Sequence, residues 1–231
     1  MGITDTLQVA SAIDGWLTEK EAKELYSLAQ EVPSDLTVVE IGSWKGRSTV
    51  CLGNGAKDGK KAVIYAVDPH TGSSELKKMF GDEINTFNEF CQNIENAGLD
   101  TIVVPVKTTS AEAVKKFNKK VGLLFIDGAH EFTYVRNDVK LWFPKVINGG
   151  IIAFHDSWHF IGPNLVTAWM LLSSSKIKNP KLIDTITTFE KVNKNTFKDR
   201  CLNIGFLVYR TLTGFIGALR LKYNNLGNSF G

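Results

Sequence analysis

The sequence predicts an α/β fold, in which a mostly parallel sheet is covered by helices on both faces. Short continuous apolar segments alternate along the chain with segments whose apolar residues recur at helical spacing. The 231 residues are 43% hydrophobic and 22% charged, which is ordinary for a chain with one well-buried core. No internal repeat, low-complexity tract or linker interrupts the pattern. We therefore expect one domain over residues 1–231, with an N-terminal helical cap at about 1–34 and a C-terminal strand pair and tail at about 181–231.

The first half of the chain supplies three of the expected strands. A helix is expected to begin at Thr18, because Thr18 and Glu21 have the spacing of a capping box. The segments that follow are a strand at 36–41, a helix at 47–56, a strand at 62–68, a loop at 71–82, a helix at 84–98 and a strand at 101–107. Pro105 lies in the last of these strands and cannot donate a ladder hydrogen bond, so that strand is expected at an edge of the sheet.

In the second half of the chain, strands and helices continue to alternate up to about residue 175, and two apolar segments follow. The expected segments are a helix at 110–120, a strand at 121–127, a helix at 133–147 that Pro144 interrupts, a strand at 149–156 and a helix at 162–175. Two late segments, 181–192 and 201–210, are apolar enough to pair as antiparallel strands. The carboxyl ends of the parallel strands should meet at one edge of the sheet.

Composition excludes several classes of protein. A formal net charge of +3, with lysine and arginine spread along the chain, does not favour nucleic acid as a partner. The first residues lack a basic region followed by an apolar run, so we expect no signal peptide and a cytoplasmic location. The three cysteines show no metal-ligand spacing and cannot all pair, which is typical of a reducing compartment: they are Cys51, Cys91 and Cys201.

The most apolar late stretch, residues 203–221, contains Arg210 and Arg220 and is too interrupted to span a bilayer. The segment from Gly205 to Lys222 is better explained as a last strand with a packing helix than as a membrane anchor.

In a parallel sheet with helices on both faces, ligands bind beyond the carboxyl ends of the strands. The polar and glycine residues expected there are Glu40, Gly42, Gly46, Asp68, His70, Thr108, Thr109, Ser110, Asp127, His130, His155, Asp156 and His159. All four histidines of the chain fall on this one edge. This clustering is the most informative single feature of the sequence.

The loop Gly42-Ser43-Trp44-Lys45-Gly46 lacks the G-x-G-x-x-G spacing of a dinucleotide site. Trp44 would block close approach of a pyrophosphate, and Glu40 would repel one. A ligand that carries an ammonium and a carboxylate suits the loop better, because Glu40 attracts the first while Ser48 and the helix N-terminus accept the second. Asp68, at the end of the next strand, is placed to accept ribose hydroxyls. S-adenosylmethionine carries all of these groups and a sulfonium.

Four motifs, "VVEIGSWKGRST", "YAVDPH", "LLFIDGAHEF" and "GGIIAFHDSW", resemble those of class I S-adenosylmethionine-dependent methyltransferases. The resemblance covers roughly residues 12–175 and is strongest to the small-molecule and sugar O-methyltransferase branch, methyltransferase family 24, with its catechol-type relatives. It implies a Rossmann-like, doubly wound sheet of seven strands, mostly parallel with the last antiparallel, and helices on both faces.

The resemblance also implies roles for individual residues. Asp127 and His130 would be the catalytic pair, with His130 as the base. Asp127 and Asp156, with His155 as a third candidate ligand, would hold a divalent metal such as Mg²⁺ or Mn²⁺. His155 departs from the family pattern, because metal-dependent relatives show an acidic or amide residue at its position. The cofactor-binding residues would be Glu40, Gly42, Ser43, Trp44, Gly46, Ser48, Asp68, Ser110, Ala111 and Asp127.

Geometry adds an expectation about the metal. Asp127 and Asp156 end neighbouring strands about 4.8 Å apart, so both carboxylates could reach one ion. His155 precedes Asp156, so on an intact strand its side chain would point to the opposite face. Each candidate also has a purely structural interpretation: Asp127 with Gly128 as a turn, His130 and Asp68 as caps, and His155 as a partner of a neighbouring loop.

The expected function is O-methylation of a hydroxyl on a small molecule, sugar or glycoside, with S-adenosylmethionine as cofactor. An N-methyltransferase, a nicotinamide-binding enzyme and a non-catalytic module on the same fold stay as alternatives. The expected partner is a small-molecule acceptor, with no nucleic acid and no transmembrane segment, and a homo-oligomer is left open.

Overall fold

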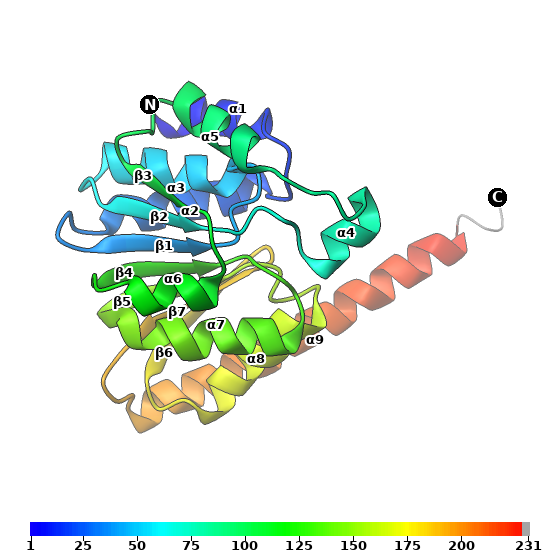
Figure 1. Ribbon diagram of the computed structural model, residues 1–231. Helices are drawn as coiled ribbons and strands as arrows, with labels where there is room; N and C mark the ends of the chain where they lie inside the picture. The colour runs from blue at the N-terminus through cyan, green and yellow to red at the C-terminus, as the bar shows by residue number, and fades with distance from the viewer. Residues whose placement is uncertain (228–231) are drawn as a thin grey trace.

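The computed structural model describes residues 1–227, with side chains described up to Thr213, and contains one seven-stranded sheet between two layers of helices (Figure 1). The strand order is β3-β2-β1-β4-β5-β7-β6. Six strands run in the same direction and β7 runs opposite to them, which confirms the expected fold class. The strands are β1 (Thr37–Ile41), β2 (Val63–Val67), β3 (Val103–Val106), β4 (Val121–Ile126), β5 (Val146–Phe154), β6 (Ile177–Ile183) and β7 (Ile186–Lys191).

Each face of the sheet buries its own core. Successive residues of β1 point to opposite faces, so that Val38 lies in one apolar cluster and Val39 in the other. The first cluster packs under α1 (Ile3–Ser11), α2 (Glu19–Glu31), α3 (Arg47–Asp58) and α5 (Phe87–Asn96). The second packs under α6 (Ser110–Lys116), α7 (Phe132–Trp142), α8 (Ile161–Ser173) and α9 (Phe197–Gly227).

Three local signals in the sequence, at Thr18, Pro105 and Pro144, are confirmed. Thr18 caps α2: its hydroxyl accepts from the Glu21 amide at 3.2 Å, and its own amide donates to Glu21 Oε2 at 2.9 Å. Strand β3, which contains Pro105, lies at the edge of the sheet. Pro144 ends α7 and begins a short 3₁₀ helix, Phe143–Lys145.

The expected strand at 201–210 is wrong, because this segment is the beginning of α9. The inward side of α9 carries buried Asn203 and Arg210, seven residues apart, with half-buried Phe206 and Leu207 between them. This is the i, i+3, i+4, i+7 spacing of a helix, which a continuous apolar run conceals. The antiparallel pair is formed instead by β6 and β7, which meet at a turn where Asp184 has a left-handed φ of 47°. The expected tail beyond residue 227 lies outside the described residues.

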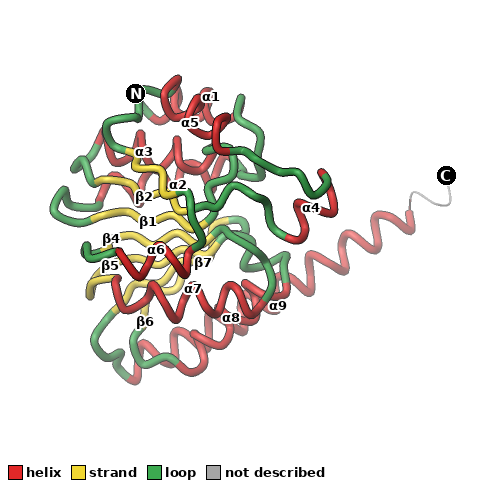
Figure 2. The backbone as a smooth tube through the Cα atoms, in the orientation of Figure 1, coloured by secondary structure: helices red, strands yellow, loops and turns green. Residues whose placement is uncertain are grey.

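Two further boundaries affect the functional edge. The segment 71–82 is not wholly a loop, because α4 (Ser74–Phe80) forms within it, and Figure 2 shows this short helix projecting from the carboxyl edge of the sheet. Strand β5 ends at Phe154, two residues earlier than expected, so His155 and Asp156 lie beyond the strand. Within residues 1–227, no helix combines the length and the apolar character needed to cross a bilayer.

Candidate active site

The glycine loop joins β1 to α3 and lies directly against the end of β4. Gly42 and Gly46 have left-handed φ angles of 86° and 94°, and Trp44 between them has a φ of 48°. A Cβ atom on Gly42 would come within 2.2 Å of the carbonyl oxygen of Asp127, so only glycine permits this approach. The loop therefore brings the β1 and β4 ends of the site into contact.

Asp68 holds the glycine loop by its backbone. Its Oδ2 atom accepts hydrogen bonds from the amides of Ser43 and Trp44, both at 2.9 Å, and its Oδ1 atom accepts from the His70 amide at 2.6 Å. A carboxylate has about four acceptor positions, so it can still accept from a ligand. The hydroxyl of Ser43 is buried and has no hydrogen-bond partner among the described residues, so it too is available to a ligand.

Glu40 is fully buried beneath the loop. Its two carboxyl oxygens accept hydrogen bonds from the hydroxyls of Ser48, at 2.6 Å, and Thr49. Burial raises the pKa of Glu40 to about 8, although these two hydroxyls oppose the shift, and the charges of Asp127 and Asp68 add to it. Glu40 is thus neutral near pH 7 until a cation approaches it. The hydroxyl hydrogen of Ser48 is used in the bond to Glu40 and is not free to bind the carboxylate of a ligand.

Replacing Glu40 by glutamine should change how stability depends on pH. Between its ordinary value of 4.5 and its folded value of about 8, Glu40 keeps a proton that the unfolded chain releases. Its contribution to stability therefore falls as pH rises through this window and then levels off. We expect the ligand-free Glu40→Gln variant to gain stability relative to the wild type between about pH 5 and about pH 9, as measured by urea unfolding. Glu95→Gln, at an exposed position, is the control. If the free energies of unfolding of the wild type and the Glu40→Gln variant differ by the same amount at about pH 5 and at about pH 9, the account is contradicted.

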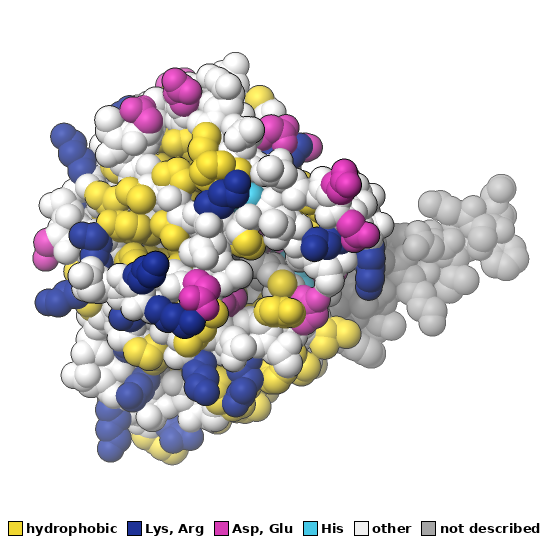
Figure 3. Space-filling view, viewed as in Figure 1, with side chains coloured by type: hydrophobic (Ala, Val, Ile, Leu, Met, Phe, Trp, Pro, Cys, Tyr) yellow, Lys and Arg dark blue, Asp and Glu magenta, His cyan; other side chains and the backbone are white. Residues whose placement is uncertain are grey.

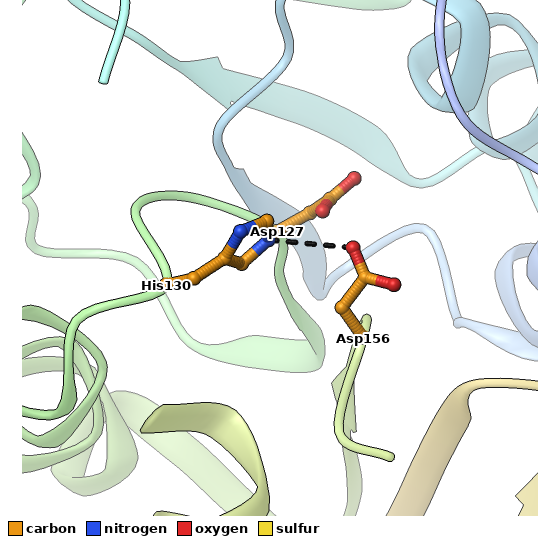
Figure 4. Close-up of side chains that lie close together, drawn as sticks. All are labelled: Asp127, His130 and Asp156. Carbon is orange, nitrogen blue, oxygen red and sulfur yellow. Dashed lines mark ion pairs between the residues drawn. The ribbon is translucent and has the colours of Figure 1, made fainter. Parts of the chain in front are cut away.

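At the ends of β4 and β5, Asp127, His130 and Asp156 converge (Figure 4). His130 Nε2 lies 3.3 Å from Asp156 Oδ2, and His130 Nδ1 is hydrogen-bonded to Glu75 Oε2 of α4 at 2.6 Å. The ring stacks on Phe160, with centroids 3.9 Å apart. Burial lowers the pKa of His130, but the two carboxylates outweigh it, and the pKa is raised above its usual value of 6.5.

His155 is a buried link between the site and α2. Its Nδ1 atom lies 2.9 Å from Asp127 Oδ1 and 3.2 Å from Asp156 Oδ2, and its Nε2 atom lies 3.5 Å from Glu21 Oε2. Burial opposes the charged ring, yet the carboxylates, Asp127 first, raise the pKa of His155 well above its usual value.

His155 and Asp156 were expected to point to opposite faces only on an intact strand, and this condition is not met. The strand has ended before them, and Asp156 adopts a left-handed φ of 52°, which turns both side chains toward Asp127. The same contacts make His155 a cationic partner of the acids in this structure rather than an open position for a metal.

The donor set at this edge fits a divalent cation. Asp127, His130 and Asp156 each offer one ligand atom, and these three atoms lie within 4.8 Å of one another. Mg²⁺ prefers ligands that are all oxygen atoms, whereas Mn²⁺ also accepts an imidazole nitrogen. Two carboxylate oxygens and one imidazole nitrogen can therefore bind either ion, and they favour Mn²⁺ more than an all-oxygen set would. His155 is not part of this set.

Ser110 and Ala111 lie at the start of α6, where the cofactor's adenine was expected. The Ser110 hydroxyl is bonded to Asp138, and the indole nitrogen of Trp142 donates to it at 2.8 Å, so it faces α7. Its single donor hydrogen is therefore already used within the protein. Of the remaining histidines, His70 is buried with Nδ1 2.9 Å from Thr86 Oγ1, and His159 is exposed.

The sequence did not indicate several residues that shape this edge. Trp16 and Phe80 contact Trp44 with ring centroids 6.3 and 6.1 Å away, beside a cavity of about 310 Å³ next to the glycine loop. Glu75 and Phe160 bracket His130. Glu21 was recognised only as a capping residue. No motif marks Trp16, Glu75 or Phe80, since each reaches the site from a segment remote in sequence.

Comparison with known proteins identifies the family. Residues 39–157, just over half of the chain, match a family model described as a methyltransferase domain. The chain belongs to this methyltransferase family. The match begins in β1 and ends just after Asp156, so it includes the glycine loop and the Asp127–His130–Asp156 cluster.

The chain also resembles individual proteins. It is 30% identical over 124 residues to the uncharacterized protein R132 of Acanthamoeba polyphaga mimivirus, covering 53% of the chain, and it spans only about half (52%) of that protein. The O-methyltransferase NovP has a similar structure, with a TM-score of 0.64 and 16% identity over 78% of this chain and 84% of NovP. An O-methyltransferase from Bacillus cereus in complex with SAH has a TM-score of 0.58 and 14% identity, over 82% of this chain and 90% of that one. At these identities the two structures show a shared fold.

Proposed function

We propose that this methyltransferase transfers a methyl group from S-adenosylmethionine to a hydroxyl group of a small molecule, such as a sugar or glycoside. One observation carries the proposal: the glycine loop touches the end of β4, so a ligand held at Glu40 and Asp68 adjoins the cluster of Asp127, His130 and Asp156. The small net charge of +3 supports a small-molecule acceptor rather than nucleic acid, and the free cysteines support a cytoplasmic location.

The cofactor's charged groups match the loop. An ammonium near Glu40 would lower the pKa of that buried acid and ionise it, so the two would form an ion pair. The Ser43 hydroxyl and the α3 N-terminus are available to the carboxylate, and Asp68 is available to the ribose hydroxyls. The backbone of Ser110 and Ala111 would meet the adenine. Bound S-adenosylhomocysteine (SAH) in the Bacillus cereus O-methyltransferase supports the same cofactor here.

The reaction itself requires a base. The acceptor hydroxyl gives its proton to His130 as its oxygen forms a bond to the sulfonium methyl carbon; the carbon–sulfur bond breaks, and its electron pair stays on sulfur. The products are a methyl ether, neutral SAH and protonated His130. Asp156 and Glu75, which flank the ring, stabilise that imidazolium. Orientation of the two substrates supplies much of the remaining rate.

A divalent cation fits the proposal as well. Asp127 and Asp156, with His130 or the acceptor's oxygens, would hold it. When bound, such an ion would act as a Lewis acid that lowers the pKa of the acceptor hydroxyl. Asp127 also holds His155, and that contact neutralises part of the charge of the two acids.

Replacing Asp68 by alanine should weaken SAH binding strongly. The variant loses charge-assisted hydrogen bonds of about 1.5–3 kcal/mol each to the ribose, and the amides of Ser43 and Trp44 lose their acceptor. Isothermal titration calorimetry with SAH measures the effect, and Asp35→Ala at an exposed position is the matched control. If the Asp68→Ala variant is folded and binds SAH as tightly as the control, the ribose assignment is incorrect.

A further inference from the structure

Exposed apolar side chains gather on two neighbouring helices, α8 and α9. Of the eighteen large apolar residues that are exposed in the described part of the chain, ten lie on this pair. They are Ile161, Leu165, Trp169 and Leu172 of α8 and Phe197, Leu202, Ile204, Val208, Tyr209 and Leu212 of α9. The two helices pack against each other, and we refer to the surface of these ten residues as the α8–α9 face.

Both helices are firmly attached by their other sides. The four exposed residues of α8 follow i, i+4, i+8 and i+11 spacing, which places them on one side of that helix. The inward side of α9 is held by Asn203, which donates to the Ile177 carbonyl at 3.1 Å, and by buried Arg210, which donates to Thr167 Oγ1 at 2.7 Å. The apolar side chains are therefore exposed on anchored helices and are not a consequence of loose packing.

The border of this face along α7 and α8 is basic. A groove of about 390 Å³ between α7 and α8 has Trp169 in its wall and Arg136, Lys140 and Lys176 around it, with no acidic residue in its lining. These three cations form no ion pair with any residue that the structure describes. Helix α8 itself has no charged residue. Figure 3 shows dark-blue basic side chains beside yellow apolar ones along the edge where α7 and α8 lie.

We propose that the α8–α9 face docks on an anionic lipid surface. Apolar side chains would enter the interfacial region, Trp169 would lie at its border, and the three cations would meet lipid phosphates. Charge complementarity favours an anionic lipid surface, because the three cations beside the face have no acidic residue in the groove lining and lipid phosphates would supply their counter-charges. The face begins at Ile161, next to Phe160, whose ring stacks on His130, so docking places the carboxyl edge of the sheet beside the lipid.

Co-sedimentation of the full chain with vesicles tests the proposal. Equimolar phosphatidylglycerol and phosphatidylcholine vesicles should bind the chain, pure phosphatidylcholine vesicles should bind it many-fold more weakly, and high salt should release it. Arg136→Gln with Lys140→Gln should weaken binding about fivefold for each charge removed. Leu165→Glu with Tyr209→Glu should weaken it by about tenfold or more. Val104→Glu, at an exposed apolar position on the opposite edge of the sheet, should have no effect.

Thermal unfolding and SAH binding establish that each variant is folded. The proposal is overturned if the wild-type chain does not bind the anionic vesicles, if it binds both vesicle types equally, or if the folded α8–α9 variants bind like the wild type. A dimer in size-exclusion chromatography that dissociates in the Leu165→Glu, Tyr209→Glu variant would assign the face to a second copy and would equally overturn it.

Discussion

The His130→Ala variant is expected to transfer methyl groups about 10²–10⁴-fold more slowly than the wild type, with nearly unchanged SAH affinity. His130 lies between Asp156 and Glu75 and has no hydrogen bond to the glycine loop, so its loss removes the proton acceptor and leaves the cofactor residues in place. The wild-type rate should also fall as pH falls, with a midpoint above 6.5, since the pKa of His130 is raised and only the neutral ring can accept a proton. Single-turnover assays with a hydroxylated acceptor measure both effects.

The chain offers a matched control for this variant. His159 follows the same strand as Asp156 but is exposed, so His159→Ala should have close to the wild-type rate. An unchanged single-turnover rate in His130→Ala would show that the base is elsewhere, and His155, in contact with Asp127, would be the next residue to test.

Removal of a divalent metal is the second large effect. We expect a strong chelator to lower methyl transfer by about 10²-fold or more, with recovery on addition of Mg²⁺ or Mn²⁺, because a bound ion would lower the pKa of the acceptor hydroxyl. Asp156→Asn should lower activity similarly and weaken Mn²⁺ binding, which electron paramagnetic resonance measures directly. Asp156 is one of three residues whose ligand atoms lie within 4.8 Å of one another, whereas Asp35 is exposed, so Asp35→Asn is the control.

The chelator experiment can also show that the site needs no metal. If the chelator has no effect and Asp156→Asn stays active, the site works without metal. The carboxylates of Asp127 and Asp156 would then orient the acceptor or His130. His130→Ala separates the two roles of the histidine: loss of turnover with retained Mn²⁺ binding identifies a base, and loss of both identifies a ligand.

The order of strands and helices along the chain, and the edge of the sheet that carries the candidate site, could be predicted from the sequence because both depend on local patterns. Apolar strands alternate with helical segments, and the strand-ending residues Asp68, Asp127 and Asp156 must meet where parallel strands share a carboxyl edge. Proximity of Asp127 to Asp156 followed from adjacent strands β4 and β5. Strand geometry brings these residues close, whereas the direction of the Asp156 side chain depends on the end of β5 at Phe154 and on the left-handed φ of Asp156.

Contacts between remote segments could not be predicted in this way. The bond from Glu75 to His130 joins residues 55 apart in sequence, through a short helix without a periodic apolar pattern. The approach of Glu21 to His155 depends on how α2 packs, although the capping signal itself was visible. The start of α9 was mistaken for a strand because apolar residues on both its buried and its exposed sides hide the helical period.

The central claim is that the glycine loop binds S-adenosylmethionine and not a dinucleotide. Calorimetric titration of the full chain with SAH and, in parallel, with NAD tests this claim most directly. We predict saturable SAH binding and much weaker NAD binding, because the Trp44 side chain stands in the loop where a pyrophosphate would need close approach to the backbone. Saturable NAD binding by a folded chain that does not bind SAH would contradict the account.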